Sequence, residues 1–321
     1  MTLSRTSSSQ DIKKFQEALL TLGYDVGRTG ADGDLGQKSL GAAYDAAEDF
    51  SLEGPEGGVV PDKTVAEILR LADEKRSSKI ALPPNFLDLT DHAATAWRRS
   101  VRPWSTITGG TLHQTGCPMP EISDAEMAWF QAEGTLHPKN TKAMMRWVKH
   151  LCAYDANNKP QYQSLKTHYG ITYRGVIIAV HPLTAFGWHA QGLSRSTIGY
   201  ELAGFFAGIE DDPKTIPSGG FPVQSVTEAQ IAAMLALVPY DKAVLQAHGS
   251  DYKFLHPHRI AAPRGSRRPD PGSKAWQRIA LPLIQSLHLS DGGPGFIFGS
   301  KGEGRLPIPE AWDAAKKGIP Y

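Results

Sequence analysis

The sequence predicts an α/β fold in which helices flank a mixed central β-sheet, together with a small N-terminal domain of three helices. Two observations lead to this expectation. Beyond about residue 100, β-branched and glycine-rich segments typical of strands alternate with segments of helical periodicity, as expected when helices cover a sheet. Before about residue 72, three amphipathic segments are separated by loops rich in glycine and aspartate. A length of 321 residues is also more typical of two domains than of one core.

The first helix of the small domain is expected over residues 10–22, with Ser9 as its N-cap and Gly23 as its stop. The apolar residues that recur there at helical spacing are Ile12, Phe15, Leu19 and Leu22. A second helix is expected to bury one face made of Leu40, Ala43, Tyr44, Ala47 and Phe50. A third, short helix opens at the N-cap Asp62 and buries Val65, Ile68 and Leu69.

Four segments are expected along the chain. Residues 1–72 form the helical domain, and residues 73–99, charged and then proline-rich, form a linker. Residues 100–289 form the larger domain. Residues 290–321 form a C-terminal tail to which the sequence assigns no role.

The larger domain begins with a strand, STITGGTLHQTG, that runs into His113. A helix is expected over residues 140–151. The segment HYGITYRGVIIAV predicts a β-hairpin that turns at residues 173–175, and STIGYELAG predicts a further strand.

A second long helix is expected after Thr227, which forms a capping box with Gln230. Its buried stripe is predicted to be Ile231, Met234, Leu235 and Val238. Residues 244–247 are interpreted as one more strand. The segment HPHRIAAPRGSRRPDPG has neither helical nor strand periodicity and is interpreted as a loop.

The composition excludes several classes of function. A net charge of +1 argues against a dedicated nucleic-acid-binding protein. No apolar run approaches the roughly 18 residues of a membrane span, and the first residues contain no apolar stretch like that of a secretory signal. The two cysteines, Cys117 and Cys152, are too few to build the fold and are expected to be free thiols.

The histidines suggest a metal site. A catalytic zinc ion is usually held by three protein ligands, brought together from separate elements, with one position left open. His113 at a strand end is one candidate ligand, because a strand presents a side chain on a rigid element. The loop that follows residue 255 offers His256, His258 and Asp270, the last in a setting of proline and glycine that fixes an irregular backbone.

Five motifs in order carry a resemblance to a known family: TLHQTG, YGITYRGVI, GWHAQG, STIGYELAG, and His-Arg followed ten residues later by Asp-Pro-Gly. Together, over roughly residues 100–285, they resemble the type-2 class of N-acetylmuramoyl-L-alanine amidases, to which a phage lysozyme and the peptidoglycan-recognition proteins are related. The resemblance implies a Zn²⁺ site formed by His113, His258 and Asp270. The gap before Asp270 is longer than in the relatives, so His256 and His248 remain alternatives to His258.

The same resemblance implies roles for other residues. Glu201, in STIGYELAG, matches the general base, and a cation at Arg268 would stabilise the developing oxyanion. The residues that would contact the substrate are Trp188, His189 and Tyr169.

The N-terminal segment resembles the peptidoglycan-binding domain found on many wall hydrolases. The matching pieces are FQEALLTLGYD, DGDLG and VVPDKTVAEIL, over roughly residues 10–70.

The resemblance implies zinc-dependent hydrolysis of the amide bond between N-acetylmuramic acid and L-alanine in bacterial peptidoglycan, by a wall lytic enzyme or a phage endolysin. A protein made in the cytoplasm without a signal would then reach the wall by lysis or non-classical export. Two alternatives are a cytosolic amidase that recycles muropeptides and a peptidoglycan-recognition protein without catalysis. No oligomeric state is predicted.

Overall fold

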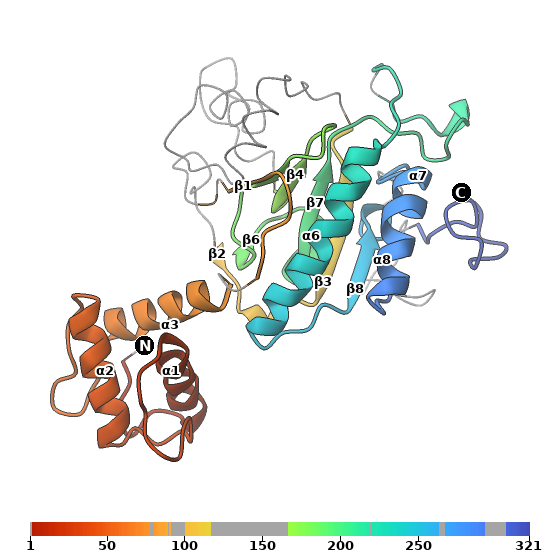
Figure 1. The fold of residues 1–321 in the computed structure, drawn as a ribbon. Coiled ribbons are helices and arrows are strands. Elements are labelled where there is room, and N and C mark those ends of the chain that lie inside the picture. Colours follow the sequence, from red (N-terminus) through yellow and green to blue (C-terminus); the bar gives the residue numbers. More distant parts are fainter. Residues whose placement is uncertain are drawn as a thin grey trace. The chain divides into compact units, whose positions relative to one another are not determined.

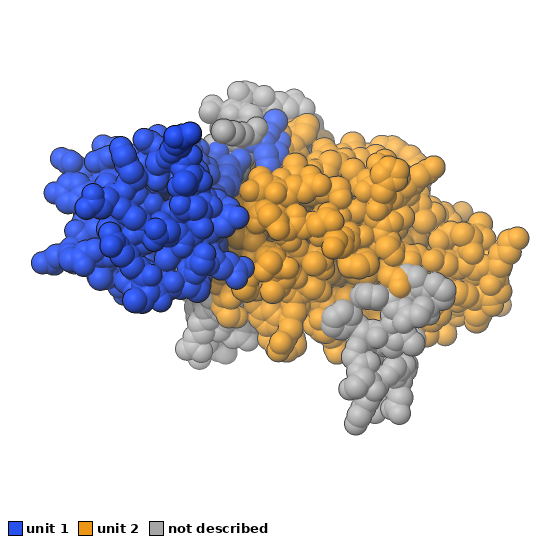
Figure 2. All heavy atoms as spheres, turned by 90° about the horizontal axis from the view of Figure 1, so that it is seen from below, with its two compact units in different colours: residues 1–81 blue, residues 82–321 orange. Residues whose placement is uncertain are grey.

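The computed structural model divides the chain into two compact units, residues 1–81 and residues 82–321 (Figure 2). It describes residues 2–77, 80–88, 90, 100–116, 166–218, 220–262, 267–292 and 306–321. The helix expected over residues 140–151 and both cysteines, Cys117 and Cys152, lie outside the described residues. None of the described helices is long and apolar enough to span a bilayer.

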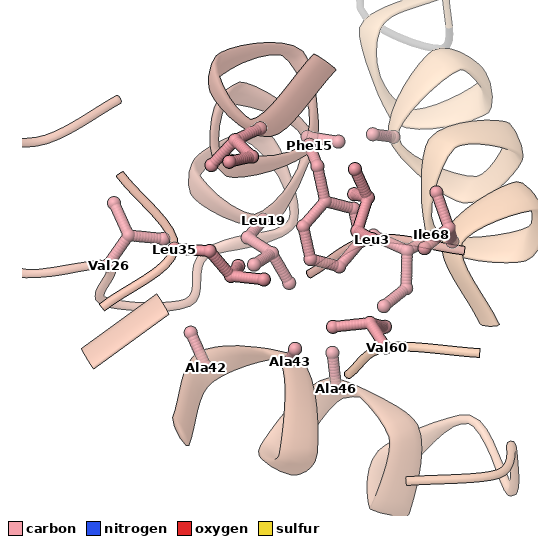
Figure 3. Packing of buried hydrophobic residues seen from close by; sticks show 14 residues of the cluster. Leu3, Phe15, Leu19, Val26, Leu35, Ala42, Ala43, Ala46, Val60 and Ile68 are labelled. Carbon is pink, nitrogen blue, oxygen red and sulfur yellow. The ribbon is translucent and has the colours of Figure 1, made fainter. Parts of the chain in front are cut away.

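The N-terminal unit contains the three expected helices: α1 (Ser9–Leu22), α2 (Gln37–Asp49) and α3 (Asp62–Ser77). Its core lies between them, with Leu3, Phe15 and Ile68 fully buried at its centre (Figure 3). Gly23 ends α1 in the left-handed conformation at φ 107°, as predicted. The N-cap is Ser8 rather than Ser9, because the Ser8 hydroxyl accepts the N–H of Asp11.

Helix α2 packs through alanines rather than through its aromatic residues. Tyr44 is 57% exposed and Phe50 38% exposed, against the prediction that both are buried. The buried positions of the helix are Ser39, Ala42, Ala43, Ala46 and Ala47. The alanines Ala42, Ala43 and Ala46 therefore form the contribution of α2 to the buried core cluster.

The C-terminal unit is built on a six-stranded mixed sheet in the order β1-β5-β4-β7-β3-β8 (Figure 1). Its strands are β1 (Phe86–Asp88), β3 (Gly109–Gln114), β4 (Tyr169–Ile171), β5 (Ile177–Ala179), β7 (Thr197–Leu202) and β8 (Phe254–Pro257). All neighbouring strands are parallel except the predicted hairpin β4–β5. Two further strands, β2 (Ser100–Val101) and β6 (Ala185–Phe186), form a separate antiparallel pair. The predicted mixed central sheet is therefore present.

Helices cover one face of this sheet. Helix α6 (Glu228–Ala247) begins at Thr227 with the predicted capping box to Gln230. Beside it runs a second helical segment, formed by α7 (Ser273–Ala275), a π-helical turn over Trp276–Ala280 and α8 (Leu281–Ser286) (Figure 1). Short 3₁₀ turns of the described residues lie at Trp104–Thr106, Gln191–Arg195, Pro213–Thr215 and His258–Ile260.

Several local predictions differ from the structure. Residues 73–99 are not wholly a linker, since α3 continues to Ser77 and the apolar Phe86 and Leu87 form the buried edge strand β1. Residues 244–247 are the last turn of α6, and the buried side of α6 contains Leu237 in place of the predicted Leu235, which is 39% exposed. The predicted loop, which begins at His256, overlaps the end of β8 (Phe254–Pro257), a short strand that pairs with the distant β3.

A buried carboxylate joins α6 to the sheet. Asp241 is fully buried, and its two carboxylate oxygens accept the hydroxyls of Tyr169 and Tyr200 at 2.8 and 2.7 Å. The two tyrosine rings stack with their planes 4° apart. Burial raises the pKa of Asp241 to about 7, although both hydroxyl bonds act in the opposite direction.

We expect the Asp241 carboxyl to make folding stability depend on pH. The folded protein holds this proton more tightly than the unfolded chain, so the contribution is complete below about pH 4 and is lost as the pH rises to about 7. The change is on the order of 4 kcal/mol. Asp241→Asn should flatten this part of the curve in denaturant unfolding from pH 4 to 8, whereas an unchanged slope would contradict the assignment.

Candidate metal centre

The candidate site lies at the C-terminal ends of three neighbouring parallel strands, β7, β3 and β8. His113 is the penultimate residue of β3 and lies in register with Glu201 on β7. His258 follows directly after the end of β8, the other neighbour of β3. Because residues in register on parallel strands share a face, His113 and Glu201 point to the same side of the sheet. The adjacent Tyr200 points to the other side, where α6 lies.

The side chains of His113, His258 and Asp270 converge on one point. The two Nδ1 atoms of the histidines are 2.9 Å apart, and His258 Nδ1 is 2.9 Å from Asp270 Oδ2. The three ligand atoms all lie within 4.8 Å of one another, and all three residues are buried. Within the described part of the chain, this is the group of histidine and acidic side chains that could hold a metal ion.

Gln114 fixes Asp270 to the end of β3. Its backbone N–H donates to Asp270 Oδ1 at 2.9 Å, and its side-chain amide donates to the Pro269 carbonyl at 2.8 Å. The same side chain accepts the N–H of Phe206 at 2.6 Å. Gln114 thereby holds the turn before the cis Asp270–Pro271 peptide next to His113. Sequence reasoning missed this role, although Gln114 directly follows His113.

His189 sets the tautomer of His113. The Nε2 atom of His189 lies 3.1 Å from the Thr197 carbonyl, which can only accept, so this nitrogen carries the proton. Burial lowers the pKa of His189 to about 3, so the ring is neutral and its Nδ1 is an acceptor. That Nδ1 lies 3.0 Å from His113 Nε2, which therefore donates.

The consequence is that His113 Nδ1 carries a lone pair. Burial, with the neighbouring His258 next in effect, lowers the pKa of His113 well below its usual value, so that the ring is neutral. With its Nε2 protonated toward His189, the Nδ1 lone pair points toward His258 and Asp270. Two imidazole nitrogens and a carboxylate oxygen form a donor set that suits Zn²⁺, and a hydrogen bond to the far nitrogen of a ligand is the usual support. The residues present therefore fit a zinc ion.

Gly199 makes the approach of His189 possible. A Cβ atom at this position would lie 2.9 Å from the Cγ and Nδ1 atoms of the His189 ring. A side chain on residue 199 would therefore push the ring away from β7 and from His113. This explains the glycine within the strand segment STIGYEL.

Glu201 has the properties of an acid–base group. Burial, and then the charge of Asp270, raise its pKa to about 8, while Arg267 acts in the opposite direction. A divalent cation held beside it would lower this pKa again. A carboxyl group that titrates near neutral pH beside a candidate metal site can take and return a proton.

Two adjacent cations, Arg267 and Arg268, line the same pocket as Asp270. The charge of Arg267 lowers the pKa of both His113 and Glu201. The guanidinium of Arg268 instead lies over the ring of Tyr321, 5.4 Å from its centroid. The role predicted for Arg268 from its position two residues before Asp270 stays a prediction, and Arg267 is a second candidate for the same role.

The predicted substrate-contacting residues lie in different places. His189 lies against His113, and Trp188 is exposed at 64% and makes an edge-to-face contact with Phe186. Tyr169 is buried on the α6 face and donates to Asp241, so the prediction that it binds substrate is wrong. Strand alternation turns its ring away from the side that carries His113.

The two alternative ligands lie outside the cluster. His256 Nδ1 is 3.1 Å from the Asp291 carbonyl, and the His256 ring stacks on Phe254. His248 caps the C-terminus of α6 and stacks on Trp104 with ring centroids 3.9 Å apart. The geometry thus brings His258, and neither alternative, to His113 and Asp270.

Substitution of His189 should weaken metal binding. His189→Gln removes the acceptor for His113 Nε2–H and should lower Zn²⁺ affinity about 10- to 100-fold, as measured by chelator competition. His189→Asn is the matched control, because its Oδ1 is as many bonds from Cα as the histidine Nδ1 and can still accept. Equal affinities for the Gln and Asn variants would contradict the tautomer assignment.

Comparison with known proteins adds a family match. The profile of the family described as N-acetylmuramoyl-L-alanine amidase matches residues 103–273. No curated protein matches the chain. Similar solved structures include the endolysin amidase LysCS from Clostridium intestinale, with 12% identity, 65% of this chain and 99% of that chain covered, and a TM-score of 0.35. Another is Drosophila peptidoglycan recognition protein PGRP-LB in complex with tracheal cytotoxin, with 14% identity, coverage of 67% and 94%, and a TM-score of 0.36.

Proposed function

This chain belongs to the N-acetylmuramoyl-L-alanine amidase family, and we propose that it hydrolyses the amide bond between N-acetylmuramic acid and L-alanine in bacterial peptidoglycan with the help of Zn²⁺. The observation that carries the proposal is the convergence of His113 Nδ1, His258 Nδ1 and Asp270 Oδ2 beside Glu201. These three residues would hold the ion. When bound, Zn²⁺ supplies Lewis acidity that polarises the scissile carbonyl and lowers the pKa of water.

Glu201 is the proposed general base. It accepts a proton from the attacking water and passes it to the nitrogen of L-alanine as the carbon–nitrogen bond breaks. The raised pKa of this carboxyl supports the second half of the task, because a weak acid near neutral pH also donates readily. Arg267 is the proposed cation that stabilises the developing negative charge on the carbonyl oxygen.

Other residues fix the positions of the proposed metal ligands. Gln114 holds Asp270, and His189 holds His113 with its Nδ1 lone pair toward the site. The exposed ring of Trp188 offers a flat apolar surface on which sugar or peptide could pack.

The N-terminal unit is the proposed wall-binding domain. The support is its compact core of three helices together with the pieces that resemble peptidoglycan-binding domains. A wall anchor suits a lytic enzyme or endolysin better than a recycling enzyme, since a soluble muropeptide needs no polymer anchor.

Digestion of purified peptidoglycan followed by mass analysis tests the proposal. The expected products are stem peptides with a free L-alanine amino terminus and glycan strands that no longer carry stem peptides. Both should form only when Zn²⁺ is present. New reducing sugar ends would instead identify a glycosidase. Binding to peptidoglycan without any product would identify a recognition protein.

A further inference from the structure

A pocket of about 430 Å³ opens directly beside the metal cluster. Asp270 forms part of its wall, so the pocket and the cluster share a residue. The remaining wall comes from the end of β3, the segment 214–218, the turn 267–269 and the residue Tyr321. Tyr321 lies far outside residues 103–273, the part of the chain that matches the family.

The C-terminal segment 306–321 is built into the C-terminal unit. Trp312 is fully buried, and its ring N–H donates to the Gly208 carbonyl. The guanidinium of Arg259, itself 1% exposed, lies 4.7 Å from the Trp312 ring centroid and 5.1 Å from that of Tyr321. Arg259 also donates to the Arg268 carbonyl at 3.0 Å. One buried cation thus ties the segment to the turn that carries Asp270.

Gly208 allows Tyr321 to reach the pocket. A Cβ atom on residue 208 would overlap the hydroxyl of Tyr321. The ring is therefore seated closely against the backbone that follows β7, and Arg268 lies over it at 5.4 Å. This cation–π contact restricts where the Arg268 guanidinium can lie.

The charge of the pocket selects its ligand. Its lining contains three cations, Lys214, Arg267 and Arg268, and one carboxylate, Asp270. Both oxygens of Asp270 are already engaged, one by the Gln114 N–H and one by His258. The surplus of positive charge favours an anionic group, and a guanidinium binds a carboxylate through two parallel hydrogen bonds.

We propose that the C-terminal segment completes the substrate pocket, with Tyr321 positioning Arg268 to bind a carboxylate of the peptide part of the substrate. This inference rests on the proposed function, because it takes the peptide side of the scissile bond to lie in this pocket. Recognition of the peptide is then determined partly by a segment that the family match does not include.

The inference is tested by measuring how tightly the full chain binds two forms of one soluble muramoyl peptide. In one form the side-chain and terminal carboxyl groups of the peptide are free, and in the other they are amidated. Arg268→Ala should weaken binding of the free-acid ligand about 10-fold or more. Tyr321→Ala should weaken it about 3- to 5-fold. Neither variant should change the binding of the amidated ligand, and kcat should change less than KM.

Controls separate the possible outcomes. Lys317→Ala, an exposed position of the same segment, should bind both ligands like the wild type. The double variant should be no weaker than Arg268→Ala, because Tyr321 acts through that residue. Equal losses for both ligands, or additive losses, would overturn the inference. If the wild-type protein binds both ligands but hydrolyses neither, only the proposed function is overturned, because the comparison of free and amidated carboxyl groups needs no turnover.

Discussion

His113→Ala is expected to abolish peptidoglycan hydrolysis and to lower zinc content. The substitution removes one of three converging ligand atoms and the ring nitrogen that donates to His189 Nδ1. Loss of a metal's stabilisation of transition-state charge costs several kcal/mol, which corresponds to a fall of activity on the order of 10³-fold or more. Elemental analysis of the purified variant and a peptidoglycan digestion assay measure the two effects.

His256→Ala is the matched control for this variant. His256 is as buried as His113, at 1% against 2% exposure, and lies on the adjacent strand β8. It contacts the Asp291 carbonyl rather than the cluster. The control should keep its zinc and most of its activity. A His113→Ala protein that retains both zinc and activity would show that the cluster is not the catalytic centre.

Glu201→Gln is expected to lower kcat about 10²- to 10⁴-fold, because glutamine has nearly the same shape but cannot take a proton. Zinc content should not change, since Glu201 is not among the converging ligand atoms. Activity of the wild type should rise with pH as Glu201 loses its proton. The midpoint of this rise should lie below 8, because a bound cation lowers the pKa of Glu201, which is about 8 without one. This rise should be missing from the residual activity of the variant.

Glu228→Gln serves as the control for the change in charge. Glu228 is exposed and pairs with Arg278 at the start of α6, away from the cluster. It should behave like the wild type in rate, zinc content and pH profile. If Glu201→Gln kept the wild-type rate, another group would have to act as the base.

Local sequence signals determined the elements that form from their own residues. The capping box of Thr227 and Gln230, the hairpin before residue 180 and the glycine that ends α1 were all predicted correctly. Each depends on hydrogen bonds or backbone conformations within a few residues. The N-cap at Ser8 rather than Ser9 shows the usual precision of such boundaries.

Elements that depend on distant partners were predicted less well. Residues 244–247 are apolar enough for a strand, but they continue α6, whose buried side is set by the sheet beneath it. Strand β8 is short and has no period of its own, and it exists because β3 offers it an edge. Alternation along the strand predicts that Tyr169 and its sequence neighbours point to opposite faces of the sheet. It does not predict which of the two faces the helix covers.

The sequence by itself predicted the residues proposed to carry the chemistry, since His113, His258, Asp270 and Glu201 stand in motifs whose order resembles the family that the profile match shows. Only the tertiary structure decided how they are held. The contacts of Gln114 with Asp270, of His189 with His113 and of Tyr321 with Arg268 join residues between 53 and 156 positions apart. The physical reason is that a hydrogen bond or ring contact depends on distance in space, and no local pattern records which distant segments the folded sheet brings together.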